Sequence, residues 1–416
     1  MSTTTDPKWN TTPWNTPFAN MARQAIDNNL PAIKKINHQI HSDPELAYEE
    51  HHAHDNFVSL LKSLDFAVTP SAHGLATAFS AEFGSGGRLV VFNAEYDALP
   101  SIGHACGHNL IAAASFAAFL GVATALKGAG IPGRVRLLGT PAEEGGGGKL
   151  RLIEAGAYRG ASACMMTHPG PQYLLRENIT GVADVKMLAN VKWRVSFAGR
   201  EAHAAMEPWN GRNALDAVCL SYNAIAMLRQ QIRPHERIHG VIRDGGDRPN
   251  VVPGSTSVEY YVRSNTLAAA KRLWERVQLC FEGAATATGC QVSYEPINSY
   301  ADLRSSAVLC DEFVNNMPEG SVSLNEPADF LAGSTDMGNV TYECPGFHGA
   351  FGIDTERGQG NHTKPFAEAA GLDKSLDRAV EWGKGMALVA LRVLLDDSYN
   401  DVLQEDWKED MKRATQ

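Results

Sequence analysis

The chain has 416 residues, 44% of them hydrophobic, and a formal net charge of −10. Its length exceeds what one hydrophobic core usually supports, so we expect two domains. The negative charge, with no block of lysine and arginine, argues against nucleic acid or an anionic membrane as a partner.

The first twenty residues are polar and interrupted by prolines, and they contain neither a basic stretch nor an apolar stretch of the kind found in signal peptides. We expect residues 1–20 to be a flexible tail. The seven cysteines are scattered and odd in number, which is not the pattern of a disulfide framework and indicates a reducing compartment. The sequence therefore predicts a cytoplasmic protein. Further along, "HHAH" (51–54) is interpreted as a solvated face of a helix.

Three apolar runs, each ending in polar residues, follow in order: 87–100, 134–150 and 161–170. Helical stretches at 110–127 and 147–156 separate them, which predicts a largely parallel sheet covered by helices. Ligands bind beyond the carboxyl ends of the strands in such sheets. The loops expected there contain Cys106, His108, Glu143, Glu144 and His168.

The uncharged segment "LIAAASFAAFLGVATAL" (110–126) approaches the length of a membrane span. It consists mostly of small residues and directly follows a histidine cluster. We therefore expect a buried helix.

The middle of the chain has a different pattern. Alternating, helical and alternating stretches over residues 188–298 follow the order βαββαβ, which is typical of a ferredoxin-like domain. Helical and strand-like material continues after residue 300 and belongs with the first domain, so the ferredoxin-like domain is interpreted as an insertion.

The stretch "SIGHACGHNL" (101–110) places Cys106 between His104 and His108, and thiolate with imidazole is a zinc-type ligand set. A buried cysteine beside helix-capping histidines is the plain alternative. In "TPAEEG", the adjacent Glu143 and Glu144 cannot point the same way, so one can bind metal while the other faces a water. His168 and His362 bring the set to enough ligands for two ions.

Other motifs fail. "EEGGGGK" has Glu143 at the first glycine position of a phosphate-binding loop and Leu150 at its Ser/Thr position. GxSxG does not occur, which removes the anchor of a serine-hydrolase interpretation. "HERIH" (235–239) has the spacing of HExxH, but its last three residues open the strand-like stretch "RIHGVIRDGG" rather than lie on a helix, so it does not support a single-zinc protease.

Seven motifs in a fixed order resemble those of the metal-dependent aminoacylase and carboxypeptidase amidohydrolase family, in the branch of aminobenzoyl-glutamate hydrolase and β-alanyl-lysine dipeptidase. They are "EYDALPSIGHACGHN", "GTPAEEGGGGK", "MMTHPGP", "GREAHAAMEPWNGRNALDAV", "GGDRPNVVP", "GSTDMGNV" and "GNHTKPF". The resemblance spans about residues 20–395. It implies an α/β fold: a zinc-exopeptidase-like, mixed, mainly parallel sheet domain (21–187 and 300–416) interrupted by a ferredoxin-like dimerisation and lid domain (188–299).

By this resemblance two divalent ions are bound, zinc first and manganese or cobalt as alternatives. Glu143 matches the general base, and Asp97 becomes a residue that orients a ligand. Glu95 stands where many members carry a histidine ligand, and Asn109 where several carry aspartate, so whether either contributes is open. The matched metal ligands are Cys106, His108, Glu144, His168 and His362.

Three residues of the inserted domain complete the comparison. His203 matches a histidine that steadies the oxyanion, and it is expected to act in the partner's site of a homodimer. Asn250 and Arg263 match binders of the substrate carboxylate, a task that suits the planar fork of arginine. Surface salt bridges or structural roles are the alternatives for these residues.

The implied activity is hydrolysis of the amide bond of an N-acyl or aroyl amino acid, or of a dipeptide-like substrate with a free carboxylate. A broader aromatic N-acyl amidase is the first alternative. A catalytically silent metal-binding scaffold is the second, although Glu143 and all five ligands are present.

Overall fold

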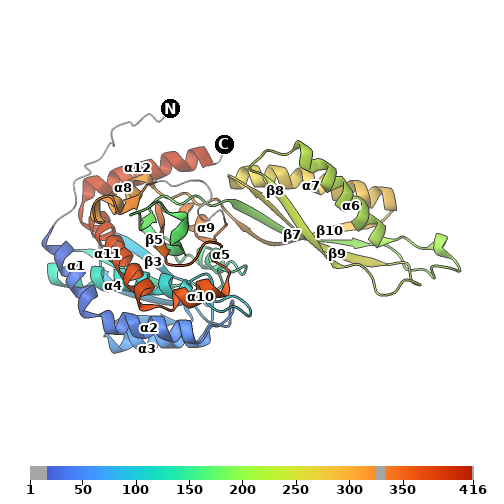
Figure 1. The fold of residues 1–416 in the computed structure, drawn as a ribbon. Coiled ribbons are helices and arrows are strands. Elements are labelled where there is room, and N and C mark those ends of the chain that lie inside the picture. Colours follow the sequence, from blue (N-terminus) through green and yellow to red (C-terminus); the bar gives the residue numbers. More distant parts are fainter. Residues whose placement is uncertain (1–15, 325–332, 415–416) are drawn as a thin grey trace. The chain divides into compact units, whose positions relative to one another are not determined.

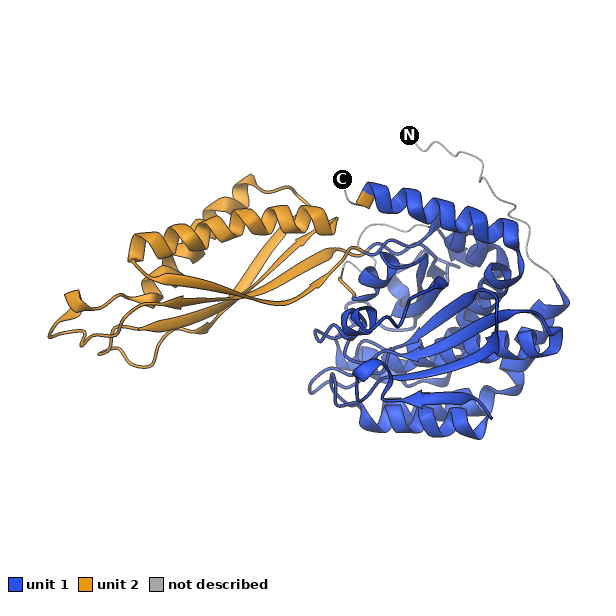
Figure 2. Ribbon diagram, turned by 180° about the vertical axis from the view of Figure 1, so that it is seen from behind, with its two compact units in different colours: residues 1–186, 303–332, 336–413 blue, residues 187–302, 333–335, 414–416 orange. Residues whose placement is uncertain are grey.

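The computed structural model describes residues 16–324 and 333–414, and these fall into two compact units (Figure 2). Unit 1 draws on residues 1–186, 303–332 and 336–413, and unit 2 on residues 187–302, 333–335 and 414–416. Unit 2 is thus an insertion in the chain of unit 1, and the chain passes back briefly through unit 2 before Asp336.

Unit 1 is built on an eight-stranded mixed sheet with the order β1-β2-β4-β3-β5-β12-β6-β11. The pairs β3–β4, β3–β5, β5–β12 and β6–β11 are parallel. Parallel strands place their carboxyl ends at one edge, where the predicted site residues follow. The strands are β1 (Ala67–Pro70), β2 (Phe79–Ser85), β3 (Leu89–Ala94), β4 (Gly133–Gly139), β5 (Ala161–Pro171), β6 (Gly181–Val182), β11 (Val322–Ser323) and β12 (Gly346–Ile353).

Helices cover this sheet (Figure 1). They are α1 (Pro17–Asn28), α2 (Leu30–Ser42), α3 (His51–Ser63), α4 (His108–Ala129), α5 (Gly148–Glu154), α8 (Ala307–Asn316), α9 (Met337–Thr341), α10 (Lys364–Ala370), α11 (Asp373–Leu395) and α12 (Asp397–Ala414).

Helix α4 lies in the core of unit 1. It is long and apolar enough to cross a membrane, but 94% of its most apolar window is buried. Helices α1, α2 and α11 and strands β3 and β5 all pack against it, and its many alanines allow that close approach on every side. The prediction of a buried helix is confirmed.

Unit 2 has the element order predicted from the sequence. It runs β7 (Ala189–Ala198), α6 (Ala214–Leu228), β8 (Arg237–Asp244), β9 (Ser255–Ser264), α7 (Leu267–Thr288) and β10 (Gln291–Tyr300). The antiparallel sheet has the order β10-β7-β9-β8, and its own core includes Phe197, Trp274 and Phe281. This βαββαβ order confirms the ferredoxin-like prediction.

Two local expectations were wrong. Helix α1 begins at Pro17, inside the stretch 1–20 predicted as a tail, because Thr16 caps it by accepting a hydrogen bond from the Ala19 N–H and Ala19 is buried. Residues 1–15 lie outside the described part of the chain. In "HHAH", His51 and His52 are exposed as expected, but His54 is buried and its Nε2 accepts the N–H of Ser71.

Candidate metal centre

The ends of the central strands of unit 1 place the predicted site residues. Strand β3 ends at Ala94, directly before Glu95 and Asp97, and β4 ends at Gly139, before the Glu143–Glu144 turn. His108 is the first residue of α4. His168 was expected in a loop but lies within β5, because that strand continues to Pro171 through its pairing with β12. His362 lies between β12 and α10.

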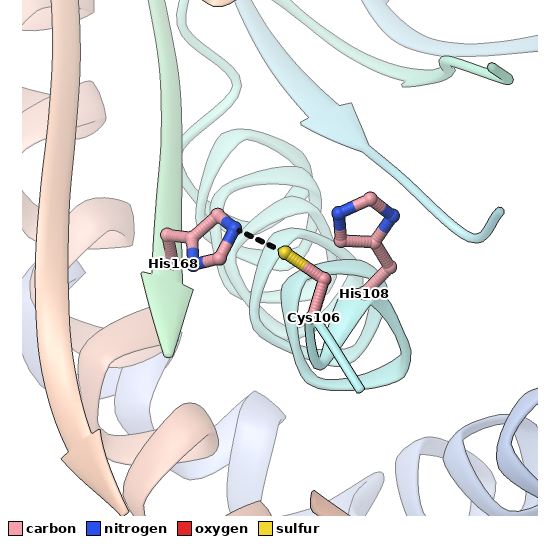
Figure 3. A group of neighbouring side chains, drawn as sticks. All are labelled: Cys106, His108 and His168. Carbon is pink, nitrogen blue, oxygen red and sulfur yellow. Dashed lines mark hydrogen bonds between the residues drawn. The ribbon is translucent and has the colours of Figure 1, made fainter. Parts of the chain in front are cut away.

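Six of the predicted site residues form three overlapping groups of three. Within each group, one nitrogen, sulfur or oxygen atom of each side chain lies within 4.8 Å of the other two. In Figure 3, Cys106 lies between His108 and His168, with its Sγ 3.4 Å from His168 Nε2. Because adjoining groups share members, the cluster can hold two ions at neighbouring positions. The groups are Cys106, His108 and His168; Cys106, Glu144 and His362; and His108, Glu143 and Glu144.

The cluster has the chemistry expected of metal ligands. His108 Nε2 is buried and has no hydrogen-bond partner among the described residues. It lies 4.0 Å from carboxylate oxygens of both Glu143 and Glu144. A buried nitrogen surrounded by carboxylate oxygens but without a hydrogen bond to them fits a ligand atom, and the donor types, thiol, imidazole and carboxylate, are those of zinc-type sites.

Asp97 fixes two members of the cluster. Its Oδ1 lies 3.0 Å from His108 Nδ1, and its Oδ2 accepts the backbone N–H of Glu144 at 2.9 Å. Burial alone would raise the pKa of Asp97, but His108 lowers it below its usual value. The ionised Asp97 thereby turns Nε2 of His108 toward the cluster, as carboxylates behind metal-binding histidines do.

The pKa shifts follow from burial and neighbouring charge. Burial lowers the pKa of His168 to about 4, which keeps its ring neutral and able to bind metal. Burial raises the pKa of the Cys106 thiol well above its usual value. Burial, together with the carboxylates of Glu95 and Glu144, raises the pKa of Glu143 well above its usual value. In the protein without metal, Glu143 is therefore a carboxyl that holds a proton readily.

The turn that carries Glu143 is strained. Ala142 has a left-handed backbone with φ 62°, and its N–H donates to Oε1 of Glu50 at 2.8 Å. Glu50 is fully buried, and its Oε2 accepts the hydroxyl of Thr77 at 2.8 Å. His362 also has φ 66°. Such conformations persist where the surroundings over-determine them, and here they aim two members of the cluster.

Sequence reasoning missed three buried charged residues beside the cluster: Glu50, Lys149 and Asp336. Lys149 Nζ donates to Glu95 Oε1 at 2.5 Å and to Asp336 Oδ1 at 2.6 Å. Lys149 and Asp336 lie inside two of the motifs that carry the resemblance, but nothing in the sequence pairs them. Asn109, left open above, is buried on α4, and its amide donates to Asn37 Oδ1 and the Ala370 carbonyl. Asn109 thereby connects α4 to α2 and α10. Its hydrogen bonds among the described residues do not include a member of the metal-ligand cluster.

The other three predicted residues belong to unit 2. His203 is exposed, and its Nδ1 accepts the N–H groups of Ala205 and Met206, both at 3.2 Å. The neutral ring therefore carries its proton on Nε2, which leaves that N–H free to donate. Asn250 is exposed, and Arg263 donates to Ser334 Oγ at 2.7 Å.

Within unit 2 these residues lie at opposite ends. His203 pairs with Val251, and the Asn250 carbonyl accepts the N–H of Ala204, so His203 and Asn250 share one end, before β9 starts at Ser255. Arg263 lies eight residues beyond Ser255, roughly 27 Å further along β9 at the rise of a strand. One copy of unit 2 thus keeps Asn250 and Arg263 far apart.

Comparisons with known proteins agree with this architecture. The family description "Peptidase dimerisation domain" matches residues 189–287. The Xaa-Arg dipeptidase of Mus musculus is 38% identical over 404 residues, which cover 93% of this chain and 91% of that protein. One of the p-aminobenzoyl-glutamate hydrolase chains of Escherichia coli is 34% identical over 282 residues, covering 64% of this chain and 57% of that protein.

Two solved structures share the fold. A dinuclear metal binding peptidase of the M20 family from Bacillus subtilis gives a TM-score of 0.64 at 21% identity, covering 87% of this chain and 98% of its own. An aminobenzoyl-glutamate utilization protein from Klebsiella pneumoniae gives 0.69 at 19% identity, covering 90% and 99%. The predicted zinc-exopeptidase-like fold with an inserted domain is confirmed.

Proposed function

The chain belongs to the M20 peptidase family of metal-dependent peptidases and amidohydrolases, as its motifs predicted, and from this we propose a specific reaction and a role for each site residue. The reaction is hydrolysis of the amide bond of a dipeptide-like or N-acyl amino acid substrate that carries a free carboxylate. The observation that supports it most directly is the cluster of six ligand-type side chains around Cys106.

The proposed metal ligands are the five residues of the resemblance. His108 and His168 offer Nε2, because their Nδ1 atoms face Asp97 Oδ1 and the Pro169 carbonyl. Two divalent ions bound there would supply Lewis-acid chemistry: they acidify water and polarise an amide carbonyl. Zinc suits the thiol and imidazole donors best, with manganese or cobalt as alternatives. The five ligands are Cys106, His108, Glu144, His168 and His362.

Glu143 is proposed as the general base and acid. It takes a proton from the attacking water at its carboxylate and returns that proton to the leaving amine, which must depart neutral. Its raised pKa without metal fits a group that holds a transferred proton between the two steps. His203 is proposed to donate its Nε2–H to the tetrahedral oxyanion.

A homodimer is proposed because the predicted substrate-facing residues of unit 2 lie at opposite ends of it. Arg263 is beside Asn190, near the point where the chain enters unit 2, whereas His203 and Asn250 are at the far end. A symmetric dimer through this dimerisation domain can bring His203 and Asn250 of one chain to the site served by Arg263 of the other. The edge strand β8, with exposed Val241 and Ile242, offers a surface for that contact.

The substrate class follows from the relatives. The Xaa-Arg dipeptidase matches over nearly its full length and the aminobenzoyl-glutamate hydrolase chain over about half, so dipeptides with a basic C-terminal residue are proposed ahead of aroyl-glutamates. The protein is proposed to act in the cytoplasm, a compartment that fits its seven free cysteines.

The test is a substrate panel. Dipeptides, aroyl-glutamates and acyl amino acids would be assayed after metal removal and separate readdition of zinc, manganese and cobalt. We expect metal-dependent hydrolysis with the highest kcat/KM for basic dipeptides. A preference for aromatic acyl groups regardless of the carboxylate would favour the broader amidase, and no hydrolysis by the reloaded protein would favour a silent scaffold.

A further inference from the structure

Glu95 is a fully buried carboxylate whose two oxygens have different surroundings. Its Oε1 accepts a hydrogen bond from Lys149 Nζ at 2.5 Å. Its Oε2 is buried as well but has no hydrogen-bond partner among the described residues. A buried charged oxygen that accepts no hydrogen bond costs about 1–3 kcal/mol or more, so Oε2 needs a positive charge beside it, either the protonated ring of His108 or a metal ion.

The unpartnered oxygen faces the candidate metal centre. Glu95 Oε2 lies 3.5 Å from His108 Nε2, which is also buried and makes no hydrogen bond among the described residues; the two atoms form an ion pair when the ring is protonated. The same nitrogen is 4.0 Å from Glu144 Oε1, the carboxylate predicted as a ligand. Glu95 is thus nearer to the ligating nitrogen of His108 than Glu144 is.

The 3.5 Å between Glu95 Oε2 and His108 Nε2 is close to the separation of two ligand atoms bound to the same metal ion. Zinc binds imidazole nitrogen and carboxylate oxygen at about 2.0–2.2 Å, which at a tetrahedral angle places the two atoms about 3.4 Å apart. We propose that Glu95 Oε2 is a further ligand of the ion held by His108, in addition to the five residues of the family resemblance. This inference rests on the metal centre of the proposed function.

Lys149 has a defined part in this arrangement. Its Nζ also bonds Asp336 Oδ1 at 2.6 Å, and its backbone N–H donates to Asp336 Oδ2 at 2.9 Å. Lys149 is therefore fixed from two sides and occupies Oε1, which leaves Glu95 only Oε2 for an ion. One buried cation between two buried carboxylates leaves a net negative charge, which a metal ion beside Oε2 offsets.

A role as counter-ion to Lys149 and to a protonated His108 is the competing explanation, and Asp336 provides the matched control for the Lys149 pair. E95Q and D336N each remove one charge from the pair around Lys149, but only Glu95 is a proposed ligand. Each variant and the parent would be loaded with Co²⁺, and the visible absorption and the affinity of both ions would be measured by competition with a chromogenic chelator.

We expect E95Q to weaken one of the two ions by about 100-fold, at the upper end of the effect of residues that only support a ligand, and to change the cobalt spectrum. D336N should keep a spectrum like that of the parent. A parent-like spectrum and parent-like affinities in E95Q would overturn the inference. If the parent itself bound no ion, the proposed function would fail instead.

A second variant covers the case in which E95Q does not fold. The double variant E95Q/K149M removes both charges of the buried pair, so no unpaired charge remains between those two residues. It should fold, as checked by circular dichroism, and still show the altered cobalt spectrum. A parent-like spectrum in this variant would equally refute a ligand role for Glu95.

Discussion

Unit 1 and unit 2 present their predicted functional residues in opposite ways. In unit 1 the side chains around Cys106 are mostly buried, and Asp97, Glu50 and Lys149 of the same unit hold them or their loops. In unit 2, His203 and Asn250 are exposed, and their contacts are with neighbouring backbone. Unit 1 therefore holds its candidate site residues in place by contacts of its own, whereas the candidate residues His203 and Asn250 of unit 2 are open to solvent.

The largest effect should come from unit 1. Glu143→Gln keeps the shape of the side chain but cannot accept a proton, so kcat should fall about 10³- to 10⁴-fold while metal content stays near that of the parent. Steady-state kinetics with elemental analysis would measure both. Glu144→Gln is the contrasting variant, because it should lose metal as well. Near-parental turnover by Glu143→Gln would remove the proposed base.

The next effect tests whether unit 2 acts on a second chain. His203→Ala should lower kcat about 10²- to 10³-fold, the usual cost of one oxyanion donor. When His203→Ala and Glu143→Gln chains are coexpressed, about half the dimers are mixed and one of their two sites is complete. Activity should then recover to about a quarter of the parent's. Purified mixed dimers as inactive as the two homodimers would place His203 in its own chain's site, or outside catalysis.

A third prediction concerns the stability of unit 1. Burial raises the pKa of Glu50 to about 7 from 4.5, so ionising it in the folded state is unfavourable. The free energy of unfolding therefore includes the full stabilising effect of the protonated Glu50 below pH 4.5. This effect is lost as the pH rises to about 7, which lowers the free energy of unfolding by about 3 kcal/mol. Glu50→Gln should remove this dependence, so the variant gains stability relative to the parent as the pH rises.

Denaturant unfolding of the metal-free proteins at pH 5 and pH 8 would measure that difference. The neighbouring Glu49, whose side chain is 76% exposed, provides the control: Glu49→Gln should follow the parent at both pH values. An equal pH dependence in Glu50→Gln and the parent would show that this carboxyl is not responsible.

The smallest effect concerns Arg263. If it holds the substrate carboxylate, Arg263→Gln should raise KM about 10- to 50-fold for acid substrates and leave carboxamide substrates nearly unchanged, as expected for a charge-assisted hydrogen bond. Arg237 faces Arg263 across the sheet, and Arg237→Gln should leave both KM values unchanged. A parent-like ratio of acid to amide in Arg263→Gln would assign this arginine a structural role.

The sequence predicted what depends on local pattern. The loops that carry Cys106 and Glu143 were identified because apolar runs give way to polar residues there, whereas the end of β5 was placed too early and His168 lies within that strand. The alternating and helical stretches over 188–298 predicted the four strands and two α-helices of unit 2. It could not predict pairings across long separations, such as Lys149 with Asp336 or Glu50 with the Ala142 N–H. Nor could it show that β9 separates Asn250 from Arg263, because a list of motifs has no distances.

The strand order of unit 1 has a consequence for the nascent chain. Strand β12 fills the position between β5 and β6, yet it begins at Gly346, roughly 175 residues after β5 ends at Pro171. At about 5–20 residues per second, the ribosome leaves that edge of β5 unpaired for roughly 10–35 s. Unit 2 is nearly continuous in sequence and emerges during this interval, so it can fold first. A chaperone that shields exposed strand edges would therefore bind the unpaired edge of β5, which includes His168, until β12 is synthesised.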